Sequence, residues 1–132
     1  MVSIPKATKP REVICFFPVE FPAKEGVVYF FIAKDVFSQF LFQTGLEQDN
    51  GIEQVLKHLV LLMKDEEFKR YSKQPFTLVL HKHQQHKMQI EQIIAPHGGS
   101  VVFDDLYLAR HMSDVMEDLY KSITQRQGNS NG

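Results

Sequence analysis

Three closely spaced apolar runs mark the first third of the chain. Residues 13–17 and 27–33 are apolar throughout, which is typical of strands covered on both faces, whereas residues 40–48 alternate moderately between apolar and polar positions. Turn-forming residues separate the runs, so we expect the three strands to pair as an antiparallel meander. Pro18 follows the first run and has no N–H to donate, which predicts a strand end, an edge or a bulge there.

After residue 48 the spacing of the apolar residues changes, and helical spacings alternate with short apolar runs. Apolar spacings of three and four predict helices over residues 52–63, 83–95 and 108–123, and short apolar runs predict strands over residues 76–80 and 100–103. The charged segment before residue 76 is expected to be a link. Because β-α-β connections are right-handed parallel crossovers, the order β-β-β-α-β-α-β-α predicts an α/β fold with one five-stranded mixed sheet flanked by helices.

Polar segments bound this pattern at both ends. Residues 1–11 contain proline and lysine without an apolar period and are expected to form an extended arm. Residues 125–132 are polar throughout, which predicts a disordered tail. Residues 12–124 remain as one domain of ordinary size.

Composition narrows the class of protein. The 132 residues include 15 Lys and Arg against 16 Asp and Glu, and the net charge of −1 argues against a uniform nucleic-acid-binding surface. The single cysteine, Cys15, excludes an internal disulfide and fits a reducing compartment. No apolar run approaches the roughly 20 residues that span a bilayer, and the first residues lack the apolar core of a signal peptide. We therefore expect a cytoplasmic protein with no membrane partner.

The second predicted strand carries a more specific pattern. A glycine precedes an aromatic-rich apolar run that ends in Asp-Val-Phe-Ser, and the residues that form the pattern are Gly26, Tyr29, Asp35, Phe37 and Ser38. This pattern resembles the catalytic cores of integrases and transposases of retroviral and insertion-sequence type, in the ribonuclease-H-like superfamily. Gln39 stands where that family usually has Arg. The resemblance covers roughly residues 12–124 and implies that nucleic acid and a second copy of the chain are partners.

The resemblance also implies a metal site that this chain does not keep. In the family, three carboxylates hold two metal ions, which clamp the attacking and leaving oxygens of phosphoryl transfer. Aligned on Asp35, the first carboxylate falls on Phe17 and the second near His83, and only the third, Glu117, is an acid. Because neither phenylalanine nor imidazole suits Mg²⁺, we expect no cofactor and no enzyme activity. Strand alternation should point Glu20 to the face opposite Phe17.

These residues favour a catalytically inactive integrase-core-like domain, a relic of a mobile element that acts in binding or regulation. Two alternatives stay open. One is a protein-interaction module with no nucleic-acid role, which the balanced charge favours. The other is an altered metal-dependent phosphodiesterase, in which His83 is a general base and Glu117 orients it.

Two further clusters are candidate sites. His81, His83 and His86 have a spacing that suits imidazole ligands of Zn²⁺ or Ni²⁺, although histidines at a helix entry also commonly face water. The second cluster is a set of basic residues that could form an edge for binding nucleic acid. Acidic residues interleave with them, so a solvated surface of mixed charge is the alternative. The residues of this basic edge are Lys64, Lys69, Arg70, Lys73 and Lys82.

Overall fold

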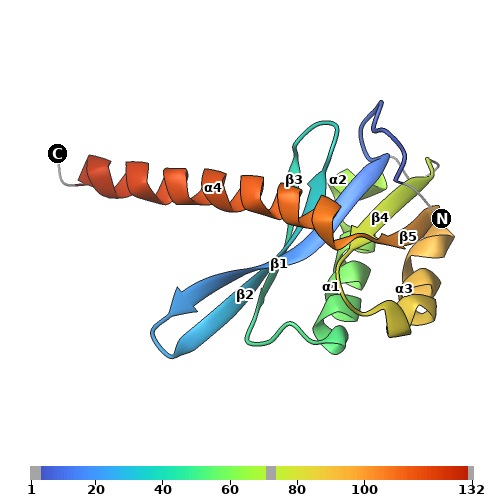
Figure 1. The fold of residues 1–132 in the computed structure, drawn as a ribbon, viewed down its shortest axis with the longest axis horizontal. Helices are drawn as coiled ribbons and strands as arrows, with labels where there is room; N and C mark the ends of the chain where they lie inside the picture. Colours follow the sequence, from blue (N-terminus) through green and yellow to red (C-terminus); the bar gives the residue numbers. More distant parts are fainter. Residues whose placement is uncertain (1–3, 71–73, 131–132) are drawn as a thin grey trace.

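A five-stranded mixed sheet forms the centre of the molecule. The computed structural model describes residues 4–70 and 74–130, and the sheet has the strand order β3-β2-β1-β4-β5 (Figure 1). The strands β1, β2 and β3 pair antiparallel, whereas β1, β4 and β5 pair parallel, which confirms the predicted meander and crossovers. The strands are β1 (Val13–Ala23), β2 (Gly26–Asp35), β3 (Leu41–Glu47), β4 (Phe76–Leu80) and β5 (Gly99–Phe103).

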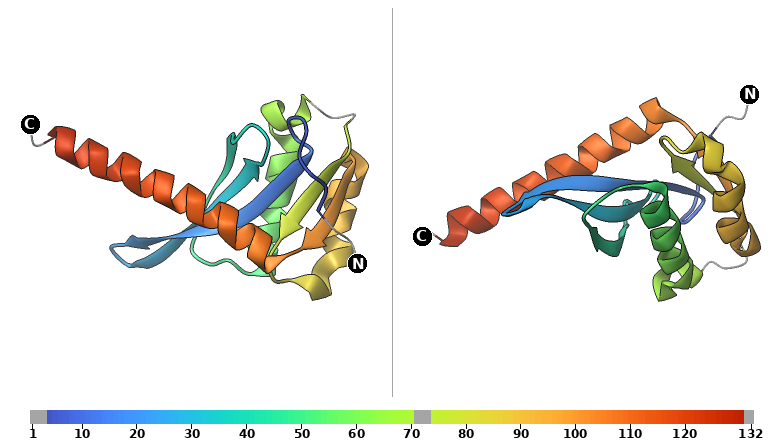
Figure 2. Two further views of the ribbon diagram at one scale, coloured as in Figure 1. Left: turned by 45° about the horizontal axis from the view of Figure 1, so that its top comes forward. Right: turned by 90° about the horizontal axis from the view of Figure 1, so that it is seen from below.

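Helices cover the two faces of the sheet unequally. The shorter helices α1 and α3 lie on one face, and the long helix α4 crosses the other and continues past the sheet (Figures 1 and 2). No helix within the described ranges is long and apolar enough to cross a membrane. The helices are α1 (Ile52–Lys64), α2 (Glu66–Lys69), α3 (Lys87–Ile94) and α4 (Asp105–Ser130), with 3-10 turns at Gln84–His86 and Ala95–His97.

Strand β1 sends alternate side chains into two separate cores. Ile14 and Phe16 pack with α1 and α3, whereas Cys15 and Phe17 pack beneath α4. All four side chains are at most 2% exposed. An unbroken apolar run therefore does mark a strand covered on both faces, and burial of each large side chain contributes about 1.5–3 kcal/mol.

Pro18 lies inside β1, opposite Phe31 of β2. The Glu12 carbonyl accepts from the Thr77 amide at 2.9 Å, so even-numbered residues of β1 direct their backbone groups toward β4. However, β4 pairs only with residues 13–15 of β1. The missing N–H of Pro18 therefore lies on an open edge, which is one of the three positions that the sequence predicts.

The end of the N-terminal arm is anchored in the structure by a buried arginine. Arg11 is 1% exposed, and its guanidinium donates to the carbonyls of Phe68 at 3.0 Å and Gln74 at 2.6 Å. The same group lies 4.6 Å from the ring centroid of Phe68 and 4.8 Å from that of Phe76. Burial lowers the pKa of Arg11. The expectation of an extended arm therefore misses the role of Arg11, which joins the arm to the segments around Phe68 and Gln74. A buried cation needs hydrogen-bond partners, and here they lie far away along the chain, so the sequence pattern does not reveal them.

Two helical segments differ from the sequence-based expectation. The charged link contains α2, which begins where the Asp65 carboxylate accepts from the amides of Glu67 and Phe68 and where Phe68 inserts into the core at 1% exposure. At the other end of the chain, α4 continues to Ser130, six residues into the segment expected to be a disordered tail. No proline interrupts that segment, and extending an existing helix costs far less than starting one.

Candidate functional site

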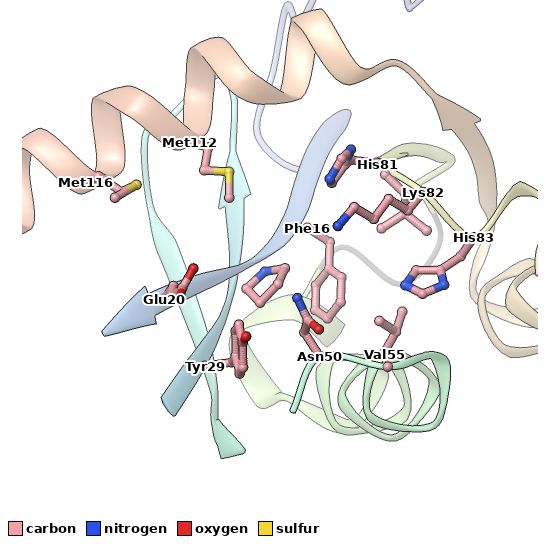
Figure 3. Close-up of a pocket in the computed structure, with 13 residues that line it drawn as sticks. Phe16, Glu20, Tyr29, Asn50, Val55, His81, Lys82, His83, Met112 and Met116 are labelled. Atoms are coloured by element: carbon pink, nitrogen blue, oxygen red, sulfur yellow. The ribbon is translucent and has the colours of Figure 1, made fainter. Parts of the chain in front are cut away.

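A cavity of about 430 Å³ opens where the carboxyl end of β4 meets β1, α1 and α4 (Figure 3). This position follows from topology, because β1 reaches past β4 and leaves one side of the strand without a partner. In open α/β sheets, ligand sites are typically found outside the carboxyl ends of parallel strands. The volume lies within the range of about 300–1,000 Å³ that is usual for small-molecule sites.

One wall of the cavity is apolar and contains sulfur. Phe16 and Pro18 of β1 share this wall with Tyr29 of β2, and Met112 and Met116 of α4 close it from the other side of the sheet (Figure 3). Phe16 itself is 2% exposed, so the accessible part of this wall comes from the half-buried Tyr29, Met112 and Met116.

The opposite wall is the turn His81-Lys82-His83 that follows β4. Lys82 and His83 both have positive φ, at 64° and 65°, which is uncommon for residues other than glycine. His81 Nδ1 lies 3.0 Å from Asp105 Oδ1, so this imidazole is held by the start of α4. Burial and, after it, the nearby His86, Lys82 and His81 lower the pKa of His83, which favours its neutral form.

Two charged side chains line the cavity at different ends. Lys82 extends toward the middle of the cavity beside Phe16, whereas Glu20 lies at the other end, where it pairs across the strands with Tyr29 (Figure 3). Among the side chains that the structure describes, which exclude those of residues 1–3, 71–73, 120 and 122–132, neither Lys82 nor Glu20 has an ion-pair partner. Glu20 is the single carboxylate among the lining residues. It faces the side of the sheet opposite Phe17, as strand alternation predicts.

Helix α1 begins at the cavity. Asn50 and Gly51 belong to the lining, and no side chain caps the helix at Gly51. The Asp49 carboxylate accepts from the Gly51 amide at 3.0 Å, and Glu53 lies in the first turn, so two acidic side chains offset the partial positive charge of the α1 start.

The structure does not place Phe17 in this cavity. Its side chain is 1% exposed and packs beneath α4, while the neighbouring Phe16 faces the cavity. An apolar side chain fills the position that the resemblance assigns to the first carboxylate, with no opening for water or a metal ion beside it.

Glu117 lies on the solvent side of α4. Its side chain is 64% exposed and pairs with Lys121 at 3.3 Å, one helical turn further on. The cavity is lined by Met116 and Met112 of the same helix, and by His83, but not by Glu117. The two residues of the phosphodiesterase hypothesis are therefore not brought together in one cavity.

The three histidines of the candidate metal site also point to different partners. His81 contacts Asp105, and His86 Nδ1 lies 2.7 Å from Gln89 Oε1. The rings of His83 and His86 are 6.2 Å apart between centroids. In the part of the chain that the structure describes, no group of three or more His, Cys, Asp or Glu side chains is arranged to hold a metal ion.

The residues of the expected basic edge are spread over distant elements. Lys64 ends the helix α1 whose start borders the cavity of Lys82, so a 13-residue helix, about 20 Å long, separates the two residues. Lys69 lies in α2, and Arg70 is paired with Glu67 at 3.1 Å. Lys73 lies outside the described residues.

A second polar cluster lies beneath α4, where sequence patterns predict only a core. Lys34 is 3% exposed, and its Nζ lies 3.1 Å from His111 Nδ1. Burial, followed by the charge of Lys34, lowers the pKa of His111. Burial also raises the pKa of the neighbouring Cys15 to about 12, so this thiol stays protonated as the sequence predicts for a core cysteine.

The sheet order and the flanking helices define the ribonuclease-H-like class of α/β folds. Comparison with models of protein families and with curated proteins gives no match. Solved structures do match, with a probability of 1.00, and they are structures of retroviral integrases.

The matched structures share the fold at very low sequence identity. A chain of the simian T-cell lymphotropic virus intasome, solved in complex with PP2A regulatory subunit B56 gamma, matches 98% of this chain with a TM-score of 0.66 and 9% identity. Two structures of the HTLV-2 integrase catalytic core domain in complex with magnesium, a dimeric and a trimeric form, each match 94% of this chain with a TM-score of 0.62 and 7% identity. This chain spans 45% of the intasome chain and 79% and 78% of the two core-domain chains. It therefore has the fold of an integrase catalytic core.

Proposed function

We propose that this chain is a catalytically inactive integrase-core-like domain, the remnant of a mobile element, and that it acts by binding. The observation that carries the proposal is Phe17, 1% exposed beneath α4 at the position of the first catalytic carboxylate. Two-metal phosphoryl transfer needs carboxylates that converge on one point. Here Glu20 is the single acid among the residues that line the cavity, and Glu117 faces solvent.

The proposal predicts that the purified protein neither nicks nor joins DNA. Double-stranded DNA is incubated with the protein in Mg²⁺ and in Mn²⁺, and products are separated on a denaturing gel. We expect no product above a protein-free control, because a single carboxylate does not hold two metal ions. Turnover that disappears in Glu117→Gln and persists in Lys24→Gln would overturn the proposal.

The resemblance supports nucleic acid and a second copy of the chain as partners of this domain, and the single cysteine fits a cytoplasmic location. The HTLV-2 core domain is described in a dimeric and a trimeric form, which supports self-association here by analogy. Light scattering at several protein concentrations tests this part. A constant monomer mass over that range would contradict it.

A protein-interaction module is a second candidate function, and one surface feature favours it. Phe37 and Phe40 lie in the connection from β2 to β3 and are 49% and 50% exposed. Exposed aromatic side chains are common anchors of protein interfaces, and the net charge of −1 gives little general attraction for phosphates. Fluorescence anisotropy with single- and double-stranded DNA and RNA separates the candidates. Binding that weakens steeply with salt supports nucleic acid, and no binding at low salt supports a protein partner.

A further inference from the structure

We infer that the free edge of β3 binds an extended peptide segment of a partner protein, which adds a strand to the sheet. The inference rests on the proposed function, because a domain that acts by binding needs a surface for its partner. Strand β3 is the last strand of the sheet and, within the described residues, pairs with β2 alone (Figure 1). Such an edge presents unpaired N–H and C=O groups, which form a template for another strand.

The open backbone groups of this edge belong to Leu41 and Gln43. The Phe40 carbonyl accepts from the Asp35 amide at 2.9 Å, so the backbone of Phe40 faces β2. Because backbone groups alternate in direction along a strand, Phe42 also faces β2, whereas Leu41 and Gln43 direct their N–H and C=O groups away from the sheet. The bulge between β2 and β3 lies beyond Gln43, so this part of the edge is regular.

A pocket with aromatic walls lies at the start of the same edge. The half-exposed ring of Phe40 packs edge-on against Phe42 at 4.8 Å between centroids, and Phe42 packs against the buried Phe68 at 5.4 Å. The core therefore holds the Phe40 ring in place. A pocket of about 310 Å³ lies beside the rings of Phe40 and Phe42, with Pro10 and Glu67 among its other lining residues. Pockets of this kind take single side chains of a peptide that pairs with a sheet edge.

The edge is uncharged, which favours a peptide over a nucleic acid. None of residues 36–46 carries a charged side chain, and this segment has neither the lysine nor the proline that commonly protects an exposed edge from pairing. Glu67 in the pocket is paired with Arg70 at 3.1 Å, and Glu47 at the end of β3 is paired with Lys57 at 2.7 Å. A phosphate backbone would find no cation in residues 36–46, whereas an uncharged, extended peptide satisfies the open backbone groups and covers the exposed rings.

The side chains of β3 also predict the pattern of the partner segment. Phe40 and Phe42 lie on the sheet face that α1 covers, whereas Leu41 and the 61% exposed Leu46 lie on the face of α4. The residues of an added strand alternate between the same two faces. We therefore expect a segment with apolar side chains at alternate positions, one of which enters the pocket beside Phe40.

A phage library of random heptapeptides, selected on the purified protein, supplies the probe. The most enriched peptide is synthesised with a fluorescein label and titrated by fluorescence anisotropy. Two further versions carry N-methyl groups on alternate amides, one at the odd and one at the even positions. An added strand pairs through one of its edges, so one version should bind at least about tenfold more weakly and the other should keep most of the affinity. Enrichment of no peptide, or equal affinities of the three versions, would overturn the inference.

Matched substitutions locate the peptide at β3. Gln43→Pro removes an outward N–H without removing a hydrogen bond to β2 and should weaken binding at least about tenfold, whereas Gln43→Thr keeps the N–H and should bind like the parent. Phe40→Ser should also weaken binding. Leu106→Ser is its control, because Leu106 is 85% exposed at the start of α4, after the opposite edge strand β5. Binding that survives Gln43→Pro, or that is lost equally in Leu106→Ser, would overturn the assignment; thermal melting checks that each variant is folded.

Amide hydrogen exchange tests the same edge in the unsubstituted protein. The amides of Leu41 and Gln43 should exchange fast in the free protein and become protected when the peptide binds, whereas the Phe42 amide, which faces β2, should be protected in both states. Protection that appears only outside β3 would overturn the inference. A dimer of the free protein that Gln43→Pro dissociates would make a second copy of the chain the occupant and would also overturn it.

The result is distinguishable from a failure of the proposed function. A protein that selects no peptide and cleaves no DNA would overturn the inference and leave catalytic inactivity standing. A protein that binds the peptide at β3 and also cleaves DNA would support the inference and overturn catalytic inactivity.

Discussion

Arg11 shows at the scale of one residue how a charged side chain becomes part of the core. Its guanidinium bonds to the carbonyls of Phe68 and Gln74, and its backbone amide donates to Asp35 at 3.0 Å. Asp35 also accepts from Ser38 at 2.9 Å, so the residues that carry the family resemblance here serve the fold. Arg11 Nε is buried and has no hydrogen-bond partner among the described residues.

Replacing Arg11 with methionine is expected to lower the free energy of unfolding by about 2–4 kcal/mol, because the carbonyls of Phe68 and Gln74 lose their donor inside the protein. Urea unfolding followed by circular dichroism measures the change. Arg70→Met is the control. Arg70 is 67% exposed and pairs with Glu67 at the surface, so this substitution should change stability by less than about 0.5 kcal/mol. Equal effects of the two substitutions would contradict the anchoring role.

The elements of this fold meet at a few positions that leave no room for a side chain. Strand β5 and helix α3 approach closely at Gly99, where an added Cβ would lie 2.5 Å from Phe76 Cζ and 2.9 Å from Ile94 Cβ. On the opposite sheet edge, the bulge between β2 and β3 gives another close approach. Gly45 has a φ of +143° there, and a Cβ would lie 3.2 Å from the His58 ring. His58 in turn bonds to Thr44 Oγ1 at 2.7 Å, which joins α1 to the edge strand.

Gly99→Ala is expected to destabilise the protein by about 1–3 kcal/mol, because Phe76 and Ile94 must shift inside a packed core. Thermal or urea unfolding measures the loss. Ser100→Ala in the same strand is the matched control, since Ser100 is exposed and has no hydrogen bond from its side chain in the described contacts, and it should change stability by less than about 0.5 kcal/mol. A Gly99→Ala protein as stable as the parent would show that β5 and α3 separate without cost.

Three buried or half-buried imidazoles, in different parts of the molecule, make its stability depend on pH. Burial is the main cause that lowers the pKa of His58, His83 and His111 below the ordinary value of 6.5. The folded protein therefore binds fewer protons than the unfolded chain once the pH falls below about 6.5. The resulting loss of stability starts there and is complete when the pH has passed the folded-state values. Above pH 6.5 the histidines are neutral in both states and contribute no pH dependence.

We expect the melting temperature to be lower at pH 5.5 than at pH 7.5, as measured by circular dichroism at constant ionic strength. His111→Gln should reduce this difference, because His111 lies 3.1 Å from the buried ammonium of Lys34 and protonation would place two positive charges together. His97→Gln is the control. A melting temperature that rises between pH 7.5 and 5.5 would contradict the assignment of neutral, buried histidines.

The order of elements could be predicted from the sequence because it depends on local periodicity. Continuous apolar runs marked the strands covered on both faces, and spacings of three and four marked α1, α3 and α4. The α2 turn was missed because its single buried residue, Phe68, stands among charged neighbours without a repeat. The resemblance placed at Asp35 and Ser38 agrees with the fold of the matched integrase cores.

The site depended on the tertiary structure for a different reason. Phe16 and Phe17 are both buried, and strand alternation sends them to opposite faces of β1, but only the arrangement of the helices decides that the cavity borders Phe16 and not Phe17. On α4, Met116 lines the cavity, whereas the next residue, Glu117, is exposed and pairs with Lys121. The sequence by itself determined the order of the five strands and of the helices α1, α3 and α4, because these depend on short repeats. The tertiary structure decided which side chains meet, because the cavity and the Arg11 anchor are built from segments that lie far apart along the chain.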